Sequence, residues 1–137
     1  MKKLLQFLVV LITISGFSQE KLDLKNPYLK AVKIEKIDNS KFDYINDAKI
    51  SWDFSSVDLK NKEVIIEVYS IYDCFNGENA NDFKSQFSIL NKDNFSVKGS
   101  YQLNHFEVMA KCFKYRVVVK EVNKEQASDW SYFMFLK

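Results

Sequence analysis

The chain has 137 residues, of which 20 are Lys or Arg and 18 are Asp or Glu, and its only arginine is Arg116. Loss of an N-terminal leader would remove Lys2 and Lys3 and bring the formal net charge to zero. A neutral chain with interspersed charges has no broad field for phosphate backbones or anionic lipid, so we expect no nucleic-acid partner. About 119 remaining residues suffice for one domain with a conventional core.

The N-terminus has the pattern of a secretory signal peptide. Met1-Lys2-Lys3 is cationic, residues 4–14 are apolar except Gln6 and Thr13, and Gly16-Phe17-Ser18 places small residues three and one before a cut after Ser18. A membrane anchor is the alternative, but this run is about half of the ~20 residues that span a bilayer. We predict a signal peptide over 1–18, a flexible stub over 19–26, and a secreted or periplasmic mature chain with no membrane span.

The first half of the mature chain is dominated by segments typical of β-strands. Residues 29–37 and 49–54 alternate apolar and polar side chains, which predicts half-buried strands. Residues 64–72 are rich in β-branched and aromatic side chains and form the strongest strand candidate. Residues 39–47 are polar and turn-rich, although Phe42, Tyr44 and Ile45 suggest that they fold back onto the sheet.

The second half gives a less regular pattern. Residues 73–82 predict a loop around Asn76-Gly77, and residues 83–90, 95–97, 101–109, 114–122 and 132–136 are the remaining strand candidates. A helix over 79–90 is the alternative for one of them, since Phe83, Phe87 and Leu90 have helical spacing. About seven short strands without long helical periodicity predict an all-β, antiparallel, immunoglobulin-like sandwich over 27–137.

The last 29 residues resemble a fibronectin type III domain. Met109 precedes Tyr115 by six residues, Val117, Val119 and Asn123 follow, and the segment ends in Ser128-Asp129-Trp130-Ser131; Trp52 stands where the family has its second-strand tryptophan. The resemblance implies that a set of residues is structural, in the core or at the tyrosine corner. These are Trp52, Met109, Tyr115, Val117, Val119 and Trp130. The middle segment, 75–111, is longer than is typical of the family.

The resemblance also implies a disulfide bond. It makes residues 64–73 the third strand and 113–122 the sixth, antiparallel and side by side, so that Cys74 and Cys112 meet at their ends. An exported chain with an even number of cysteines is free to oxidise, and we expect this pair to do so. Two buried free thiols are the alternative.

Catalytic and metal-binding patterns are weak. His105 is the only histidine, so a Cys-His arrangement would have to join it to Cys112, seven residues away. The loop over 73–82 concentrates oxygen ligands around Gly77 but lacks the spacing of a known calcium loop, and turn chemistry explains the same residues. We therefore expect no catalytic set, metal or cofactor.

Aromatic side chains are the remaining lead to function. We take Tyr72, Phe75 and Tyr101 as weak binding candidates, because exposed rings can stack on sugars or anchor a protein partner. The favoured function is an exported, non-catalytic module for protein or glycan contact. A small secreted enzyme inhibitor, or a hydrolase with a loop site, is the alternative.

Overall fold

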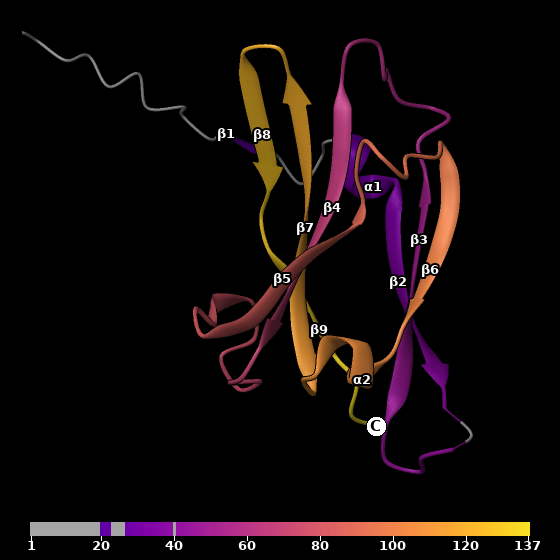
Figure 1. The fold of residues 1–137 in the computed structure, drawn as a ribbon, viewed down its shortest axis with the longest axis vertical. Coiled ribbons are helices and arrows are strands. Elements are labelled where there is room, and N and C mark those ends of the chain that lie inside the picture. The colour runs from indigo at the N-terminus through magenta and orange to yellow at the C-terminus, as the bar shows by residue number, and fades with distance from the viewer. Residues whose placement is uncertain (1–19, 23–26, 40) are drawn as a thin grey trace, which may run out of the picture.

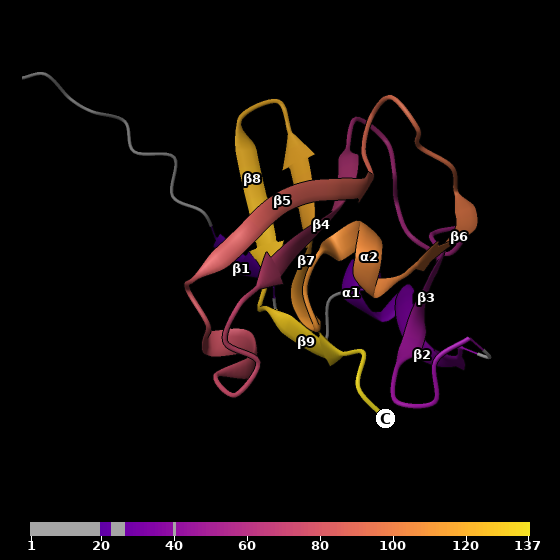
Figure 2. The same ribbon diagram turned by 60° about the horizontal axis from the view of Figure 1, so that its bottom comes forward.

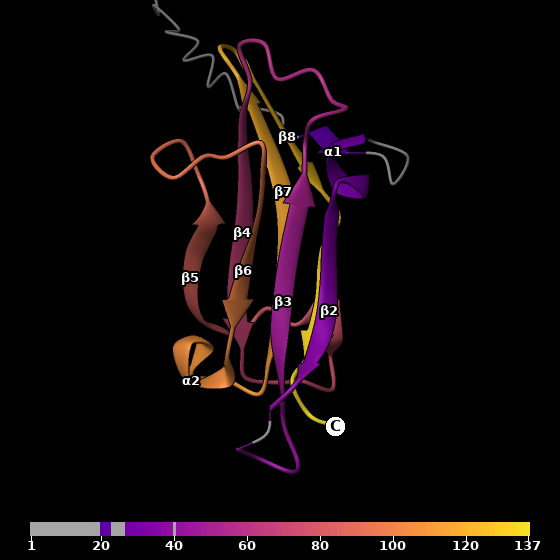
Figure 3. The same cartoon turned by 90° about the vertical axis from the view of Figure 1, so that its right-hand side faces the viewer.

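The computed structural model describes residues 20–22, 27–39 and 41–137, which form two β-sheets packed face to face (Figures 1 and 3). In the larger sheet the order is β1-β8-β7-β4-β5, with β9 also paired to β7, and in the smaller sheet it is β2-β3-β6. The larger sheet contains β1 (Glu20–Leu22), β4 (Glu63–Ile71), β5 (Phe83–Leu90), β7 (Cys112–Glu121), β8 (Lys124–Ser128) and β9 (Ser131–Met134). The smaller contains β2 (Val32–Asp38), β3 (Asn46–Asp53) and β6 (Lys98–Leu103). Every strand pair is antiparallel except β1–β8, so the predicted all-β sandwich is confirmed.

The core lies between the sheets and is rich in aromatic and β-branched side chains. Ile50 and Trp52 of β3 face Val117 and Val119 of β7 within one cluster of buried residues, as the alternation of their strands predicts. Phe113 stacks on Phe133, with ring centroids 5.2 Å apart. The core positions predicted for Trp52, Val117 and Val119 are confirmed, and Tyr115 packs against the same cluster while half-buried.

Met109 is a correction to the predicted core. It is 60% exposed and has a left-handed backbone conformation, with φ 51°. The reason is local: a one-turn helix, α2 (His105–Val108), ends there, and Val108 is the fully buried residue of that turn. The structure places Val108, and not Met109, against the core ahead of Tyr115.

Two further segments differ from the expected strands. Residues 29 and 30 belong to a short helix, α1 (Pro27–Lys30), because Pro27 favours the first position of a helix and supplies the fixed φ that a helix needs. Residues 95–97 are not a strand, and β6 begins at Lys98. The alternative helix over 79–90 is wrong, since β5 occupies 83–90 after a single 3₁₀ turn, η1 (Gly77–Asn79).

The C-terminal segment forms two strands where the sequence pattern predicts one after a turn. Ala127 of β8 pairs with Val118, and Ser131 of β9 pairs with Tyr115, so both strands lie on the same edge of β7. Between them the Ser128 hydroxyl accepts a hydrogen bond from the Val117 amide at 3.0 Å. The two strands thus behave as one strand interrupted at Asp129 and Trp130.

Trp130 lies on the outer face of the larger sheet and is half-buried. Its ring is 4.6 Å from the Tyr69 ring, and the cationic groups of Lys114 and Arg116 lie 4.8 and 4.6 Å from its centroid. Arg116 also forms an ion pair with Glu67, at 2.7 Å. These stacked aromatic and cationic side chains pack Trp130, which precedes β9, against β4 and β7.

The predicted disulfide bond is present. β4 and β7 run antiparallel in register from Glu63 opposite Lys120 to Ile71 opposite Cys112, which brings the two cysteines together at one end. Cys74 and Cys112 are bonded with their Cα atoms 5.8 Å apart. Among the described residues no helix has the length and apolar character to cross a membrane. The predicted signal peptide, 1–18, lies outside the described residues.

Candidate functional site

His105 lies among aromatic side chains in the described part of the chain. Its Nδ1 atom is buried without a hydrogen-bond partner, and its ring neighbours are Phe42, Phe106 and Phe135, at centroid distances of 5.7, 3.9 and 6.4 Å. Cys112 is committed to the disulfide and cannot supply a thiolate. The Cys-His pairing that the sequence left open is therefore excluded.

The loop over 73–82 uses its oxygen atoms to hold its own shape. The Asp73 carboxylate accepts hydrogen bonds from the Phe75 amide at 2.9 Å and from the Asn76 side chain at 2.6 Å, and Asp82 accepts one from the Asp73 amide at 3.1 Å. The bond from the Phe75 amide is that of an Asx turn, as the turn interpretation predicts, and the other two hold the loop closed. Over the described ranges, no three His, Cys, Asp or Glu side chains gather as a metal site would require.

The three weak binding candidates lie on different elements. Tyr72 and Phe75 are exposed in the connection that follows β4, whereas Tyr101 belongs to β6 in the smaller sheet. The Tyr101 hydroxyl donates a hydrogen bond to Glu107 Oε1 at 2.9 Å, and this bond raises the pKa of Tyr101 above its ordinary value. The structure therefore does not join these rings into one surface, and it gives Tyr101 a role in holding α2.

The helix α2 forms because its first turn is closed by a capping box. The Asn104 side chain accepts a hydrogen bond from the Glu107 amide at 2.9 Å, and Glu107 Oε2 accepts one from the Asn104 amide at 3.0 Å. The pattern Asn104-x-x-Glu107 is visible in the sequence and is the signal that could have revealed this turn. Together with the Tyr101 bond, the box fixes the direction in which Phe106 projects.

Five side chains form a continuous aromatic and apolar patch at this end of the sandwich, which we call the aromatic end surface: Phe42, Tyr44, His105, Phe106 and Met109. The Phe42 ring lies 6.1 Å from that of Tyr44 and 5.6 Å from that of Phe106. Tyr44 and Phe106 are 61% and 63% exposed. Figure 2 turns this end toward the viewer and shows α2 at the same end as the connection between β2 and β3.

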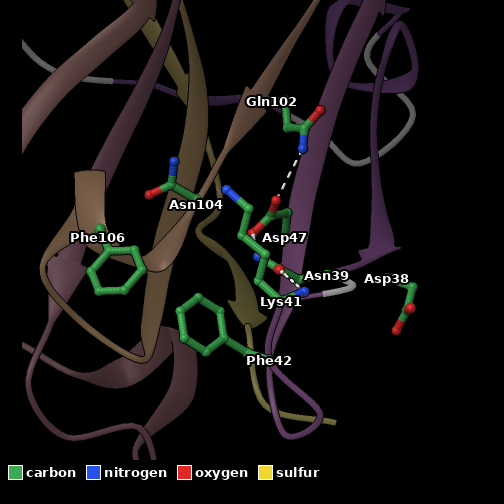
Figure 4. Close-up of a pocket in the computed structure, with 8 residues that line it drawn as sticks. All are labelled: Asp38, Asn39, Lys41, Phe42, Asp47, Gln102, Asn104 and Phe106. Atoms are coloured by element: carbon green, nitrogen blue, oxygen red, sulfur yellow. Dashed lines mark hydrogen bonds between the residues drawn. The ribbon is translucent and has the colours of Figure 1, made fainter.

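A polar hollow of about 360 Å³ adjoins the aromatic end surface, and we call it the Asp47 hollow. Its lining combines two phenylalanines with amides, carboxylates and one lysine (Figure 4): Asp38, Asn39, Lys41, Phe42, Asp47, Gln102, Asn104 and Phe106. Asp47 is only 8% exposed, and its two oxygens accept hydrogen bonds from Asn39 at 2.9 Å and Gln102 at 3.0 Å. A carboxylate is thus held in a fixed position beside two aromatic rings.

Phe106 also lines an apolar recess of about 370 Å³. It is lined by His105, Phe106, Met109, Ala110 and Lys111. The exposed Phe106 side chain therefore borders both the Asp47 hollow and the apolar recess. This arrangement suits contact with a ligand that presents both kinds of surface.

The fold and this end surface define an all-β, disulfide-bonded sandwich with a polar and aromatic depression at one end. Comparison of the chain with models of protein families, with curated proteins and with solved structures gave no match.

Proposed function

We propose that the protein is an exported, non-catalytic β-sandwich module that contacts a protein or glycan through the aromatic end surface. The observation that carries this proposal is the clustering of exposed Tyr44 and Phe106 around the Phe42 ring, with exposed Met109 in the recess that Phe106 also lines. Contiguous exposed apolar patches with a polar rim are typical of interaction sites. Here the polar side chains of the Asp47 hollow border the apolar patch.

Two features support export and a sandwich of the fibronectin type III kind. The Cys74–Cys112 bond fits an oxidising compartment, where disulfides form and persist. Leaving out the short β1, the first, second and fifth strands share one sheet and the third, sixth and last strands share the other, as in immunoglobulin-like sandwiches. Such folds carry many activities, so the proposal rests on the surface and not on the architecture.

The test is binding of the mature protein to arrays of extracellular proteins and glycans. The double variant Tyr44→Ala/Met109→Ala truncates two exposed side chains of the surface, and we expect about tenfold weaker binding. Val122→Ala is the matched control, because Val122 is exposed in the connection between β7 and β8, at the opposite end from α2 (Figure 1). Phe75→Ala tests the exposed loop beside the disulfide. Binding that is lost in Phe75→Ala and kept in the double variant would reject our placement of the site.

A further inference from the structure

We propose that the Asp47 hollow is a carbohydrate subsite, which takes one sugar ring against Phe42 and Phe106. The inference deepens the proposed function and rests on it, since it names the ligand class for part of the same end of the molecule. The volume of about 360 Å³ falls within the range of small-molecule sites, about 300–1,000 Å³.

The apolar side of the hollow fits the face of a sugar ring. The Phe42 and Phe106 rings are tilted by 58° with centroids 5.6 Å apart, too close for a ring to enter between them. They therefore form one bent wall, on which the C–H face of a pyranose can lie. Figure 4 shows the Phe42 and Phe106 rings on one side of the hollow, and Asp47 of β3 between Asn39, which follows β2, and Gln102 of β6.

The polar side of the hollow fits sugar hydroxyls, which both donate and accept hydrogen bonds. Each Asp47 oxygen receives one amide hydrogen bond and keeps lone-pair capacity for a second donor. The Lys41 ammonium in the lining is a donor. Asp38 is ion-paired with Lys137, so the Asp47 carboxylate is the group that favours a neutral polyol over a phosphate, which it would repel. A metal ion would find too few donors among the described residues.

Hydrogen bonds within the protein already fix the polar groups of the hollow. Asp47 is nearly buried and forms no ion pair with any lysine or arginine that the structure describes, so a hydroxyl donor would add stabilisation to a carboxylate held by amides alone. The capping box of α2 and the Tyr101–Glu107 bond likewise hold the turn that carries Phe106. Groups that are ordered before binding lose little entropy when the ligand arrives.

The test uses four probes, D-glucose, D-galactose, D-mannose and N-acetyl-D-glucosamine, titrated into the ¹⁵N-labelled protein and followed by amide chemical shifts. We expect at least one sugar to shift amides of the hollow, with saturation transfer from aromatic protons to ring C–H protons. Phe106→Ala should weaken that sugar about tenfold, as should Lys41→Ala, whose exposed side chain is not needed for folding. Val122→Ala, in the connection between β7 and β8 and outside the hollow, should leave the affinity unchanged.

Shifts from none of the four sugars, or equal affinity in wild type, Phe106→Ala and Lys41→Ala, would overturn the subsite. A second outcome is also decisive: the arrays show binding to a protein, this binding requires Tyr44 and Met109, and no sugar shifts any amide. That outcome would overturn the carbohydrate subsite and support the proposed binding module. If the wild-type protein shows neither array binding nor sugar binding, both proposals are rejected.

Discussion

Because Gly99 has no side chain, the Trp52 ring can pack directly against its backbone. The two residues are direct partners in the pairing of β3 with β6, and a Cβ on Gly99 would lie 2.5 Å from Trp52 Cζ2. Trp52 cannot easily move away, because its Nε1 donates a hydrogen bond to the Ser96 carbonyl at 3.0 Å and the ring is nearly buried. The absence of a side chain at this position is thus a packing requirement.

We therefore expect Gly99→Ala to destabilise the protein by about 1–3 kcal/mol, the usual effect of adding a methyl group to a filled core. Urea unfolding followed by tryptophan fluorescence measures the change. Ser100→Ala, the neighbouring exposed position in β6, is the matched control. Equal stability of Gly99→Ala and wild type would show that the Trp52 ring shifts without cost.

Asp53 has a pKa well below the ordinary value for an aspartate. Hydrogen bonds from the Ser55 side chain and the neighbouring Lys98 ammonium, with the Ser55 amide, lower the pKa of Asp53 from 3.8 to about 2. Because the folded value lies below the unfolded one, the ionised carboxylate stabilises the fold above pH 3.8, and this contribution disappears as the pH falls through about 2. The carboxylate is exposed, so salt screens part of the effect.

The corresponding prediction concerns Asp53→Asn. The difference in unfolding free energy between wild type and this variant should be constant above about pH 5 and should shrink between about pH 4 and pH 2. Urea denaturation at a series of pH values gives this difference. Asp93→Asn, at another exposed turn, is the control. A difference that does not change with pH would mean that Asp53 acts through packing alone.

At the scale of elements, α2 is a single turn whose stability depends on its cap. Asn104→Ala removes the side-chain acceptor for the Glu107 amide, and we expect it to cost about 1 kcal/mol and to loosen the turn that positions Phe106. Amide hydrogen exchange at Val108 and Met109, whose amides donate to the Asn104 and Phe106 carbonyls, should then speed up. Glu107→Gln keeps the capping box and should exchange like wild type. Unchanged exchange in Asn104→Ala would contradict the role of the cap.

Some elements were predictable from the sequence because their own residues decide them. β4 and β7 are rich in valine and isoleucine, so composition alone favours strands that are buried between neighbours. β8 was missed because Lys124–Ser128 is polar, and only its pairing with β7 makes it a strand. The alternation over residues 101–109 predicts one strand and so hides α2, although the capping pattern Asn104-x-x-Glu107 is present in the sequence.

The candidate site could not be predicted from the sequence because its residues are far apart along the chain. Phe42 lies just before β3 and Phe106 just after β6, and the two rings meet because β3 and β6 are paired antiparallel strands. The sequence indicates that some aromatic side chains are exposed, and the weak binding candidates that it suggests are Tyr72, Phe75 and Tyr101. Only the topology shows that Phe42, Tyr44 and Phe106 are the rings that come together.

At the scale of the whole molecule, the disulfide bond restrains the unfolded chain. Cys74 and Cys112 are 38 positions apart, and closing a loop of that length stabilises by about 4 kcal/mol at most in the chain-entropy treatment. We expect Cys74→Ala/Cys112→Ala to lose a large part of this, measured by urea unfolding. Wild type under reducing conditions is the comparison, and it should fall to a similar stability. A double variant as stable as the oxidised wild type would contradict this account.

The same bond has a topological consequence, because the loop that it closes contains β5, β6 and α2, the segment that crosses from one sheet to the other and back. A protease that cuts once in the exposed connection between β5 and β6 would leave one fragment holding Cys74 and another holding Cys112. Each fragment would still contribute strands to both sheets. A nicked molecule would therefore remain a single covalent species, and either half alone would lack the partners that complete its sheets.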